Sequence, residues 1–218
     1  MSFVRIKLHR TAELRWSTSQ TLTNLLCDAI QRTAIPASFR SGKNPRPDVR
    51  MAPSALPWCY QSCEYADIAL TQPMRGETVS SQLAASLPAG LELRWARRMP
   101  NHTASIAASL RGAAYAFHGA LSMKYRDAFL NCNTFPYKRV RKLRERWYDL
   151  RQVVSMLRWR REKVELYLAH LQDGAVRPHE ALAAIFHLPW EEAVLLPTER
   201  TALHIDHGVL KPFASEMP

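Results

Sequence analysis

Residues 3–10, FVRIKLHR, alternate apolar and basic side chains, with Val4, Ile6 and Leu8 on the apolar side. Successive side chains of a β-strand point to opposite faces of a sheet, so this run predicts a strand with one buried face. Residues 64–73, EYADIALTQP, alternate in the same way and predict another strand. The fold must therefore contain a sheet whose strands are buried on one side.

Helical segments lie between these strands in the first half of the chain. Apolar residues recur at helical spacing over 17–35, behind Ser and Thr residues that can cap a helix, and again over 76–90. Further strands are expected at 37–39 and 91–99. The resulting order, β-α-β-β-α-β over residues 1–99, is that of the ferredoxin-like split β-α-β unit.

The second half repeats this plan less regularly. Its expected elements are a strand at 113–121, a helix at 122–132, an extended basic segment at 135–150, two strands within 152–172, a helix at 177–188 that begins near Pro178, and a strand pair or one broken strand at 191–205. Residues 152–172 could instead form one helix, but apolar alternation on both sides of a polar RRE turn favours two strands.

We therefore predict an α+β fold of two tandem ferredoxin-like (βαββαβ) halves. A chain of 218 residues is long enough for two domains of about 100 residues each. The first domain spans 1–99 and the second 113–205, with a connection at 100–112 and a mobile tail at 206–218.

Positive charge is concentrated in one segment of the second half. The chain has a formal net charge of +11, and residues 138–163 contain eleven Lys and Arg against three acids. Such an excess favours a polyanionic partner, and nucleic acid before an anionic membrane. Aromatic residues are interleaved with the cations, and aromatic faces stack on unpaired bases while Arg and Lys neutralise phosphates. The segment therefore predicts an RNA-binding surface.

A second basic segment is the proline-rich loop FRSGKNPRPDVRMAPSALP at 39–57, with four prolines, four cations and one acid. Both of its ends lie next to strands expected in the same sheet, and its prolines restrict the backbone. We therefore predict an ordered loop that presents its cations. The RNA-binding residues predicted from the two segments are Arg40, Lys43, Asn44, Arg46, Arg50, Lys138, Arg139, Arg141, Lys142, Arg144, Arg146, Trp147, Arg158, Trp159, Arg160 and Arg161.

Several classes of site are not indicated. The sequence has no P-loop, dinucleotide fingerprint or nucleophile elbow. Cys59 and Cys63 are the only closely spaced cysteines, which does not predict a zinc site. No apolar run reaches the ~18 residues of a membrane span, and the N-terminus does not resemble a secretory signal. We expect a cytoplasmic protein with reduced thiols, no metal, no cofactor and no membrane partner.

Three segments near the loop resemble the radical SAM-linked protein family: SGKNPRP at 41–47, APSALP at 52–57 and SCEYADIAL at 62–70. That family carries S-x-G-F-N-P-R-P, a G/A-P-A-L-P run and an E-Y-x-D-x-x-L strand. Later segments, YDLRQVVSML, GAVRPHEALAAIF and ERTAL, are similar to its D-L-R-P-x-V and R-P-x-E-V-L blocks. The resemblance spans most of the chain and implies an accessory protein, found beside or fused to a radical SAM enzyme, that presents RNA for modification.

The chain departs from that family at two places. The family has an S-H-x-D motif on its first helix, where this chain has RWSTSQT with Thr18, Ser19 and Thr21. If the family's His and Asp serve chemistry or metal binding, this chain has lost that role. Lys43 replaces the family's aromatic residue after Gly42. The resemblance therefore implies a divergent relative whose partner can differ.

Tandem ferredoxin-like halves with a basic central segment also resemble the CRISPR repeat-RNA processing endonucleases. Such cleavage needs a general base for the ribose 2′-OH and cations for the developing charge. His9, His102 and His118 are candidates for that base, and His9 and His118 are the two that we retain. The glycine-rich C-terminal loop typical of that family is absent from HIDHGVLKPF at 204–213.

Three functions are consistent with these observations. The first is an RNA-binding accessory or subunit of an RNA-modifying or RNA-processing assembly, with RNA and a protein as its partners. The second is a metal-independent CRISPR-type endoribonuclease or effector-complex subunit. The third is a protein-binding scaffold whose basic surface is solvated. Salt-dependent RNA binding separates the first two from the third.

Overall fold

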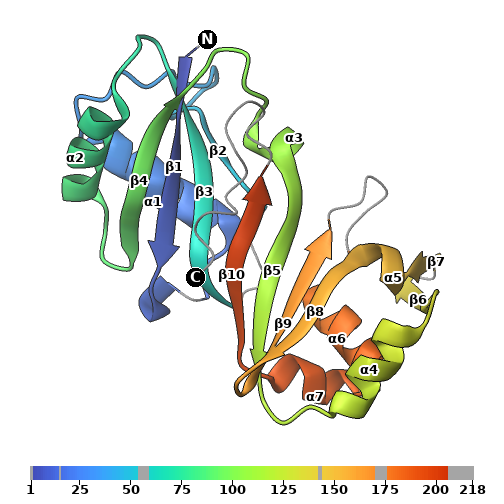
Figure 1. Ribbon diagram of the computed structural model, residues 1–218. Coiled ribbons are helices and arrows are strands. Elements are labelled where there is room, and N and C mark those ends of the chain that lie inside the picture. The colour runs from blue at the N-terminus through green and yellow to red at the C-terminus, as the bar shows by residue number, and fades with distance from the viewer. Residues whose placement is uncertain (1, 15, 54–58, 142–143, 170–175, 206–218) are drawn as a thin grey trace. The chain divides into compact units, whose positions relative to one another are not determined.

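The computed structural model describes residues 2–14, 16–53, 59–141, 144–169 and 176–205 (Figure 1). The chain folds as two compact units. Unit 1 comprises residues 1–110 with the chain end from 205, and unit 2 comprises residues 111–204.

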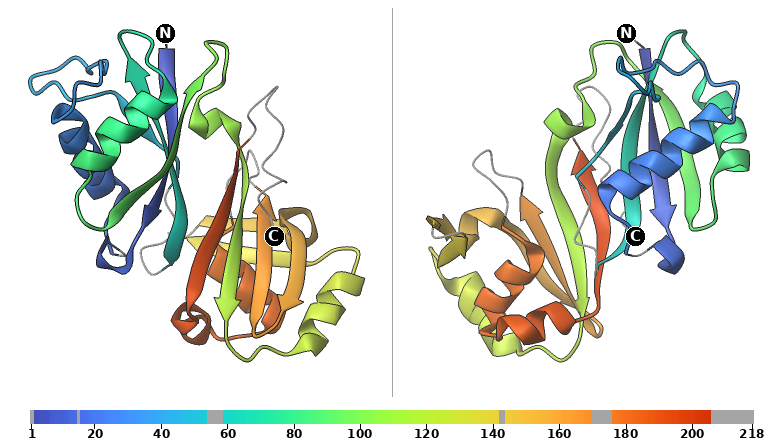
Figure 2. Two further views of the ribbon diagram at one scale, coloured as in Figure 1. Left: turned by 60° about the vertical axis from the view of Figure 1, so that its left-hand side comes forward. Right: turned by 180° about the vertical axis from the view of Figure 1, so that it is seen from behind.

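Unit 1 is a four-stranded antiparallel sheet with two main helices. Its elements are β1 (Ser2–Arg10), the 3-10 helix η1 (Ala12–Leu14), α1 (Ser19–Gln31), β2 (Val49–Met51), β3 (Tyr60–Leu70), α2 (Gly76–Ser86), β4 (Leu91–Met99) and α3 (Ile106–Ser109). The strand order is β4-β1-β3-β2. Helices α1 and α2 lie against the same face, and the opposite face is called the front face of unit 1 (Figure 2).

The alternation in β1 explains how this sheet packs. Val4, Ile6 and Leu8 are buried and pack with apolar residues of α1 and α2, including Leu26 and Leu83. The two helices can supply this layer because their apolar residues recur on one side. The strands predicted at 3–10, 64–73 and 91–99 and the helices predicted at 17–35 and 76–90 are confirmed, with shorter bounds for both helices and with the middle strand shifted to 60–70.

Helix α1 begins at the position where the resembled family carries its S-H-x-D motif. Thr18 is the N-cap, and its Oγ1 accepts a hydrogen bond from the backbone N–H of Thr21 at 3.1 Å. An N-cap oxygen satisfies one of the backbone donors that a helix start leaves unpaired. In this chain the segment therefore has a structural use that needs neither His nor Asp.

Unit 2 is also a four-stranded antiparallel sheet, and it carries a separate hairpin. Its elements are β5 (Leu110–His118), α4 (Met123–Asn131), β6 (Pro136–Arg141), β7 (Arg144–Asp149), α5 (Leu150–Val153), β8 (Val154–Arg160), β9 (Lys163–Ala169), α6 (Pro178–Phe186), α7 (Trp190–Leu195) and β10 (Thr198–Ile205). The sheet order is β10-β5-β9-β8, and β6 and β7 pair with each other as a separate two-stranded sheet. Numbered by their order along the chain, the strands of each sheet therefore follow the same sequence, 4-1-3-2.

The two strands predicted within 152–172 are confirmed as β8 and β9, which pair around the turn at Arg161 and Glu162. Val164, Leu166 and Leu168 of β9 are buried, and the residues between them are partly exposed. The sheet therefore has one core face, which α6 covers through an edge-to-face contact between His179 and Phe117 at 5.3 Å. The opposite face is called the front face of unit 2.

Three predicted elements are corrected. Residues 37–39 form isolated bridges at Ala37 and Phe39, and the second strand of the sheet is β2, which lies inside the loop predicted at 39–57. The first part of 191–205 is helix α7, framed by Pro189 at its N-cap and Pro197 after its end. The segment 100–112, predicted as a connection, contains α3 and the start of β5.

Among the described residues, no helix combines the length and the apolar character that crossing a membrane requires. The tail predicted at 206–218 lies outside the described residues.

Candidate nucleic-acid interface

The cationic loop of unit 1 is organised by one carboxylate. Arg40 Nε lies 2.9 Å from Asp48 Oδ1, and Arg50 Nη2 lies 3.1 Å from Asp48 Oδ2. Partial burial acts to raise the pKa of Asp48, but these two hydrogen bonds outweigh it, so the pKa lies below its ordinary value. Both arginine side chains remain more than half exposed. Asp48 thus fixes two guanidinium groups that still face solvent.

Backbone and side-chain contacts hold the rest of this loop. Arg46 donates to Asn24 Oδ1 at 3.2 Å and lies 3.6 Å from Asp28 Oδ1, both on α1. Arg40 N donates to the Arg46 carbonyl at 2.9 Å. Lys43 and Asn44 at the tip are exposed. The described part of the loop is therefore attached to unit 1, and its residues 54–57 lie outside the described residues.

The β6–β7 hairpin presents an aromatic side chain among cations. Trp147 is 65% exposed, and the Lys138 ammonium lies 5.8 Å from its ring centroid. Lys138 also pairs with Glu145 at 2.6 Å. Arg144 and Arg146 are exposed on the other side of the same hairpin. Arg141 ends β6 opposite Arg144, and its side chain and the predicted residue Lys142 lie outside the described part of the chain.

The second side of the hairpin is partly used for packing. Arg139 Nε lies 3.1 Å from Glu180 Oε1, which attaches the hairpin to α6. Burial, and then the charge of Glu180, raise the pKa of Tyr137 on this side. Arg139 lies directly opposite Arg146, and like charges opposite one another in a sheet repel. The Glu180 carboxylate beside Arg139 offsets that repulsion.

A row of one histidine, one lysine and one arginine, called the cationic row after the last two, crosses three strands on the front face of unit 2. Lys163 of β9 is paired in register with His118 of β5 and with Arg160 of β8. Residues directly opposite one another in neighbouring strands point to the same face. Their neighbours Phe117 and Val164 are fully buried on the α6 side, so the row points away from α6.

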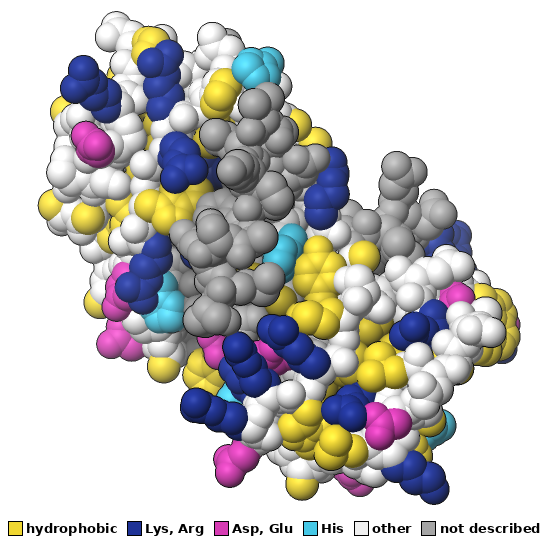
Figure 3. Space-filling view, in the orientation of Figure 1, with side chains coloured by type: hydrophobic (Ala, Val, Ile, Leu, Met, Phe, Trp, Pro, Cys, Tyr) yellow, Lys and Arg dark blue, Asp and Glu magenta, His cyan; other side chains and the backbone are white. Residues whose placement is uncertain are grey.

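The next rows of the same face add one acid and two aromatic rings. Glu165 accepts from Arg158 Nε at 2.7 Å and lies 3.7 Å from Lys163 Nζ. Tyr167 contacts His204 edge-to-face, with centroids 4.6 Å apart. Burial raises the pKa of Tyr167 and lowers that of His204, so both rings are uncharged near neutral pH. Figure 3 looks onto this face and shows Lys and Arg beside apolar side chains there.

The structure divides the basic segment 138–163 into two groups. The hairpin joins the start of β8 through α5, and the cationic row lies at the far end of β8. Seven strand residues at about 3.3 Å each separate these ends by roughly 20 Å. Arg161 is exposed in the turn next to the row, whereas Trp159 is partly buried on the α6 side opposite Val164. Trp159 is therefore not beside the cations that neighbour it in sequence.

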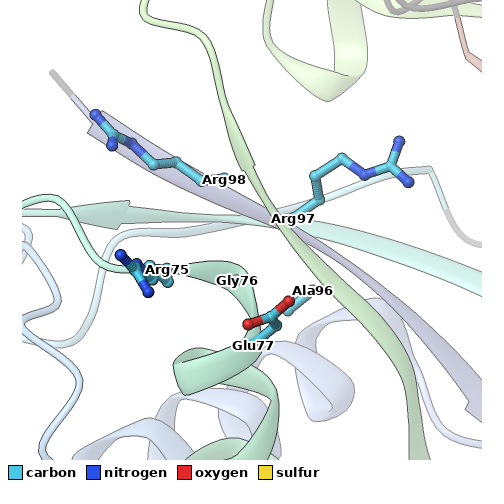
Figure 4. Close-up of a pocket in the computed structure, with 6 residues that line it drawn as sticks. All are labelled: Arg75, Gly76, Glu77, Ala96, Arg97 and Arg98. Atoms are coloured by element: carbon cyan, nitrogen blue, oxygen red, sulfur yellow. The ribbon is translucent and has the colours of Figure 1, made fainter.

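A further arginine group, which the sequence patterns did not single out, surrounds a surface pocket of about 520 Å³ at the start of α2. Arg75, Arg97 and Arg98 contribute to it, but Figure 4 shows their guanidinium groups pointing in different directions, with Glu77 between them. A Cβ on Gly76 would lie 2.4 Å from the Ala96 carbonyl oxygen, so the helix start packs directly on β4. This arrangement does not converge on one anion.

Two arginines of β1 are buried, and for Arg5 this corrects the alternating pattern, which placed it on the exposed face. Arg5 is 0% exposed and donates to both oxygens of Asp67, at 2.7 and 2.9 Å. Asp67 also accepts from the backbone N–H of Ile106 at 3.0 Å. Arg10 lies 4.0 Å from Glu64, and both side chains are buried. Buried charges need such partners, so these four residues serve the packing of unit 1, Arg5 and Asp67 on its front face and Glu64 on the helix-covered face opposite Leu8.

The candidate general bases are placed on strands. His9 is half-buried on β1, and His118 is exposed in the cationic row at the end of β5. In the described part of the chain, neither imidazole forms a hydrogen bond or an ion pair with a carboxylate. No group of three or more described His, Cys, Asp or Glu residues could hold a metal ion. Cys59 and Cys63 are buried thiols.

One protein-family model matches the chain, over residues 4–178, and it describes an uncharacterized protein conserved in bacteria, DUF2344. No curated protein matches the sequence at a significant level.

Proposed function

We propose that this chain, which belongs to the bacterial family DUF2344, is an RNA-binding protein that works as an accessory subunit of an RNA-modifying or RNA-processing assembly. The observation that carries the proposal is the row of His118, Lys163 and Arg160 on the front face of unit 2. Neighbouring strands are about 4.8 Å apart, so the row spans about 10 Å and can meet consecutive phosphates of one strand.

The aromatic side chains support single-stranded RNA as the ligand. Tyr167 and His204 lie on the same face as the cationic row, and Trp147 is exposed on the hairpin. Sequence-tolerant binding of single strands combines cations that follow the backbone with rings on which bases stack. A duplex would bury its bases and leave these rings without a stacking role.

The topology supports the finer assignment of both units as ferredoxin-like. Each sheet has the order 4-1-3-2, antiparallel pairing and helices on one face. In unit 2 the β6–β7 hairpin and α5 are inserted between the first helix and the second strand. Sheets of this kind bind RNA on the face opposite their helices, which is the face that carries the cationic row.

The radical SAM-linked resemblance supports the accessory role. Its strand motif corresponds here to Glu64, Tyr65 and Asp67, and both acids are buried beside arginines. Carboxylates held in this way stabilise the sheet and are not presented to a substrate. A chain whose motif residues serve the fold is suited to presenting RNA to a separate catalytic protein, and we propose a radical SAM enzyme as that partner.

A second candidate function rests on His118. It is the one candidate base that lies in register with a cation on the neighbouring strand, and such cations can stabilise the charge that develops during RNA cleavage. A metal-independent endoribonuclease of the CRISPR type would therefore use His118 as its base. Cleavage of a hairpin RNA in EDTA that is lost in His118→Ala would support it, and an uncleaved substrate would reject it.

The main proposal is tested by RNA binding at several salt concentrations. Replacing Arg158, Arg160 and Lys163 together by Ala should flatten the slope of log K against log salt by about 2, since each phosphate contact on a single strand contributes about 0.7. The control replaces Arg75, Arg97 and Arg98 by Ala, which removes the same charge where the guanidinium groups diverge. Equal weakening by both triple variants would show that binding follows net charge and would overturn the proposed interface.

A further inference from the structure

A cavity of about 210 Å³ lies on the front face of unit 1. Ala69 of β3 forms part of its lining, and Phe3 of β1 is paired with Ala69 in register. On the other side of Ala69, the backbone carbonyl of Asp48 accepts from Ala69 N at 3.0 Å. The small Ala69 side chain therefore sits between an aromatic ring and the start of β2.

The remaining walls are polar. Arg50 and Asp67 close one end, where they are paired in register between β2 and β3. Asn101, Thr103 and Ser105 line the cavity from the segment that follows β4. The cavity thus combines one aromatic face, one guanidinium, one side-chain amide and two hydroxyls.

The charged groups of the cavity are already neutralised by neighbours. Asp67 is bonded to Arg5, and Asp48 is bonded to Arg40 and Arg50. A cation or a metal ion would have to displace these arginines, and an anion would face two carboxylates. A neutral, planar ligand with its own donors and acceptors avoids both costs.

We infer that this cavity binds one nucleobase of a single-stranded RNA, an inference that rests on the proposed function. Phe3 supplies the stacking face, because its half-buried ring forms part of the cavity lining, and the Arg5 guanidinium lies 5.8 Å from the ring centroid. The Asn101 amide carries both donors and an acceptor, which matches the Watson–Crick edge of a base. The volume is below the ~300 Å³ of sites for drug-sized ligands and suits a single ring system.

The hydroxyls complete this recognition. Ser105 Oγ accepts from Ala108 N at 3.4 Å and keeps its own proton available for a ligand. Thr103 is partly exposed and can donate or accept. The Arg50 guanidinium, held by Asp48, can stack on the base or contact its ribose phosphate without further ordering.

The test compares a short single-stranded RNA with an abasic oligonucleotide of the same length, which keeps the phosphates and removes the bases. The full chain should prefer the base-containing strand, and Phe3→Leu and Asn101→Ala should reduce that preference about tenfold, as expected for one lost stacking or base contact. The control is Trp190→Leu, which changes a partly exposed aromatic residue on α7. This variant should retain the full preference for the base-containing strand. Circular dichroism of each variant checks that Phe3→Leu still folds.

A strand carrying 4-thiouridine, crosslinked by light and mapped by mass spectrometry, should label residues within 1–5 or 100–106. If RNA binds with its normal salt dependence while both variants keep the preference, the cavity inference is overturned and the proposed function stands. If no RNA binds, saturation-transfer NMR with free nucleosides tests whether the cavity by itself binds a base. Transfer to base protons that Asn101→Ala abolishes would support the cavity without the proposed function, and no transfer would overturn both.

Discussion

His179 Nε2 lies 3.0 Å from Thr198 Oγ1 inside unit 2, and both residues are buried. Thr198 Oγ1 donates its only proton to the Leu196 carbonyl at 2.8 Å, so His179 Nε2 must carry the hydrogen and donate to Thr198. Burial lowers the pKa of His179 from 6.5 to about 4, so the ring is neutral near pH 7 with its hydrogen on Nε2.

This pair predicts acid destabilisation of unit 2. The unfolded chain protonates His179 near pH 6.5 and the folded chain only near pH 4, so the stabilising effect of the neutral ring is complete above pH 6.5 and is lost as the pH falls toward 4. The free energy of unfolding should drop by about 2–3 kcal/mol between pH 7.5 and 4.5 from this group. Urea unfolding at both pH values measures it.

His179→Gln should be less stable at pH 7.5 but should lose most of this extra pH dependence, because glutamine does not titrate. His102→Gln, at an exposed position, is the matched control and should behave as the original protein. An unchanged pH dependence in His179→Gln would contradict the assignment.

The Arg5–Asp67 pair predicts a strong effect on the stability of unit 1. Asp67→Ala leaves the fully buried Arg5 guanidinium without its carboxylate and should destabilise the unit by about 3–5 kcal/mol. Glu92→Ala removes the half-exposed partner of Arg94 and should cost less than about 1 kcal/mol. Thermal unfolding measures both, and similar losses from the two variants would argue against a buried pair that stabilises the front face.

We expect the ion pairs of Asp48 to keep the cationic loop in one conformation. Asp48→Asn removes the charge that holds Arg40 and Arg50, so trypsin should cleave between residues 40 and 50 faster than in the original chain. Asp127→Asn, whose carboxylate pairs with the adjacent Arg126 on α4, is the control. Mass spectrometry of the first cleavage products measures this, and equal cleavage rates in both variants would show that Asp48 does not order the loop.

We expect a substitution of Trp147 to weaken RNA binding without changing the stability of the protein. The ring is largely exposed, so Trp147→Ala should change the free energy of unfolding by less than about 0.5 kcal/mol. Loss of one stacking ring should weaken RNA binding by about tenfold. Leu195→Ala, at another exposed apolar position, should leave both unchanged. Fluorescence anisotropy with a labelled single strand gives the affinity, and an unaltered Kd would exclude the hairpin from the interface.

Local periodicity was sufficient for most elements of the fold. The alternation in β1, β9 and β4 and the helical spacing in α1 and α6 each need only a short window of sequence, because the faces of a strand or helix follow from its own geometry. The three-residue strand β2 was missed because its length is too short for a period and it follows two prolines. Helix α7 was missed because its six residues, framed by two prolines, carry no repeated apolar spacing.

The candidate interface was predictable only in part. The sequence located the excess of charge at 138–163, but strand register divided it between the hairpin and the far end of β8, and register turned Trp159 toward the α6 side. His118 joined the cationic row through pairing with Lys163, which lies 45 positions later in the chain. No spacing within a linear window carries that information.

The sequence by itself determined the alternation of strands and helices and the basic character of the chain, because both depend on the side chains of each segment alone. Only the tertiary structure decided that Arg5 is buried against Asp67, 62 positions away, while Arg160 and Lys163 share one exposed row. Whether a cation is buried or presented depends on which carboxylate its strand partner brings within reach. That choice is made by the pairing of distant strands, since a buried charge is stable only where such a partner is present.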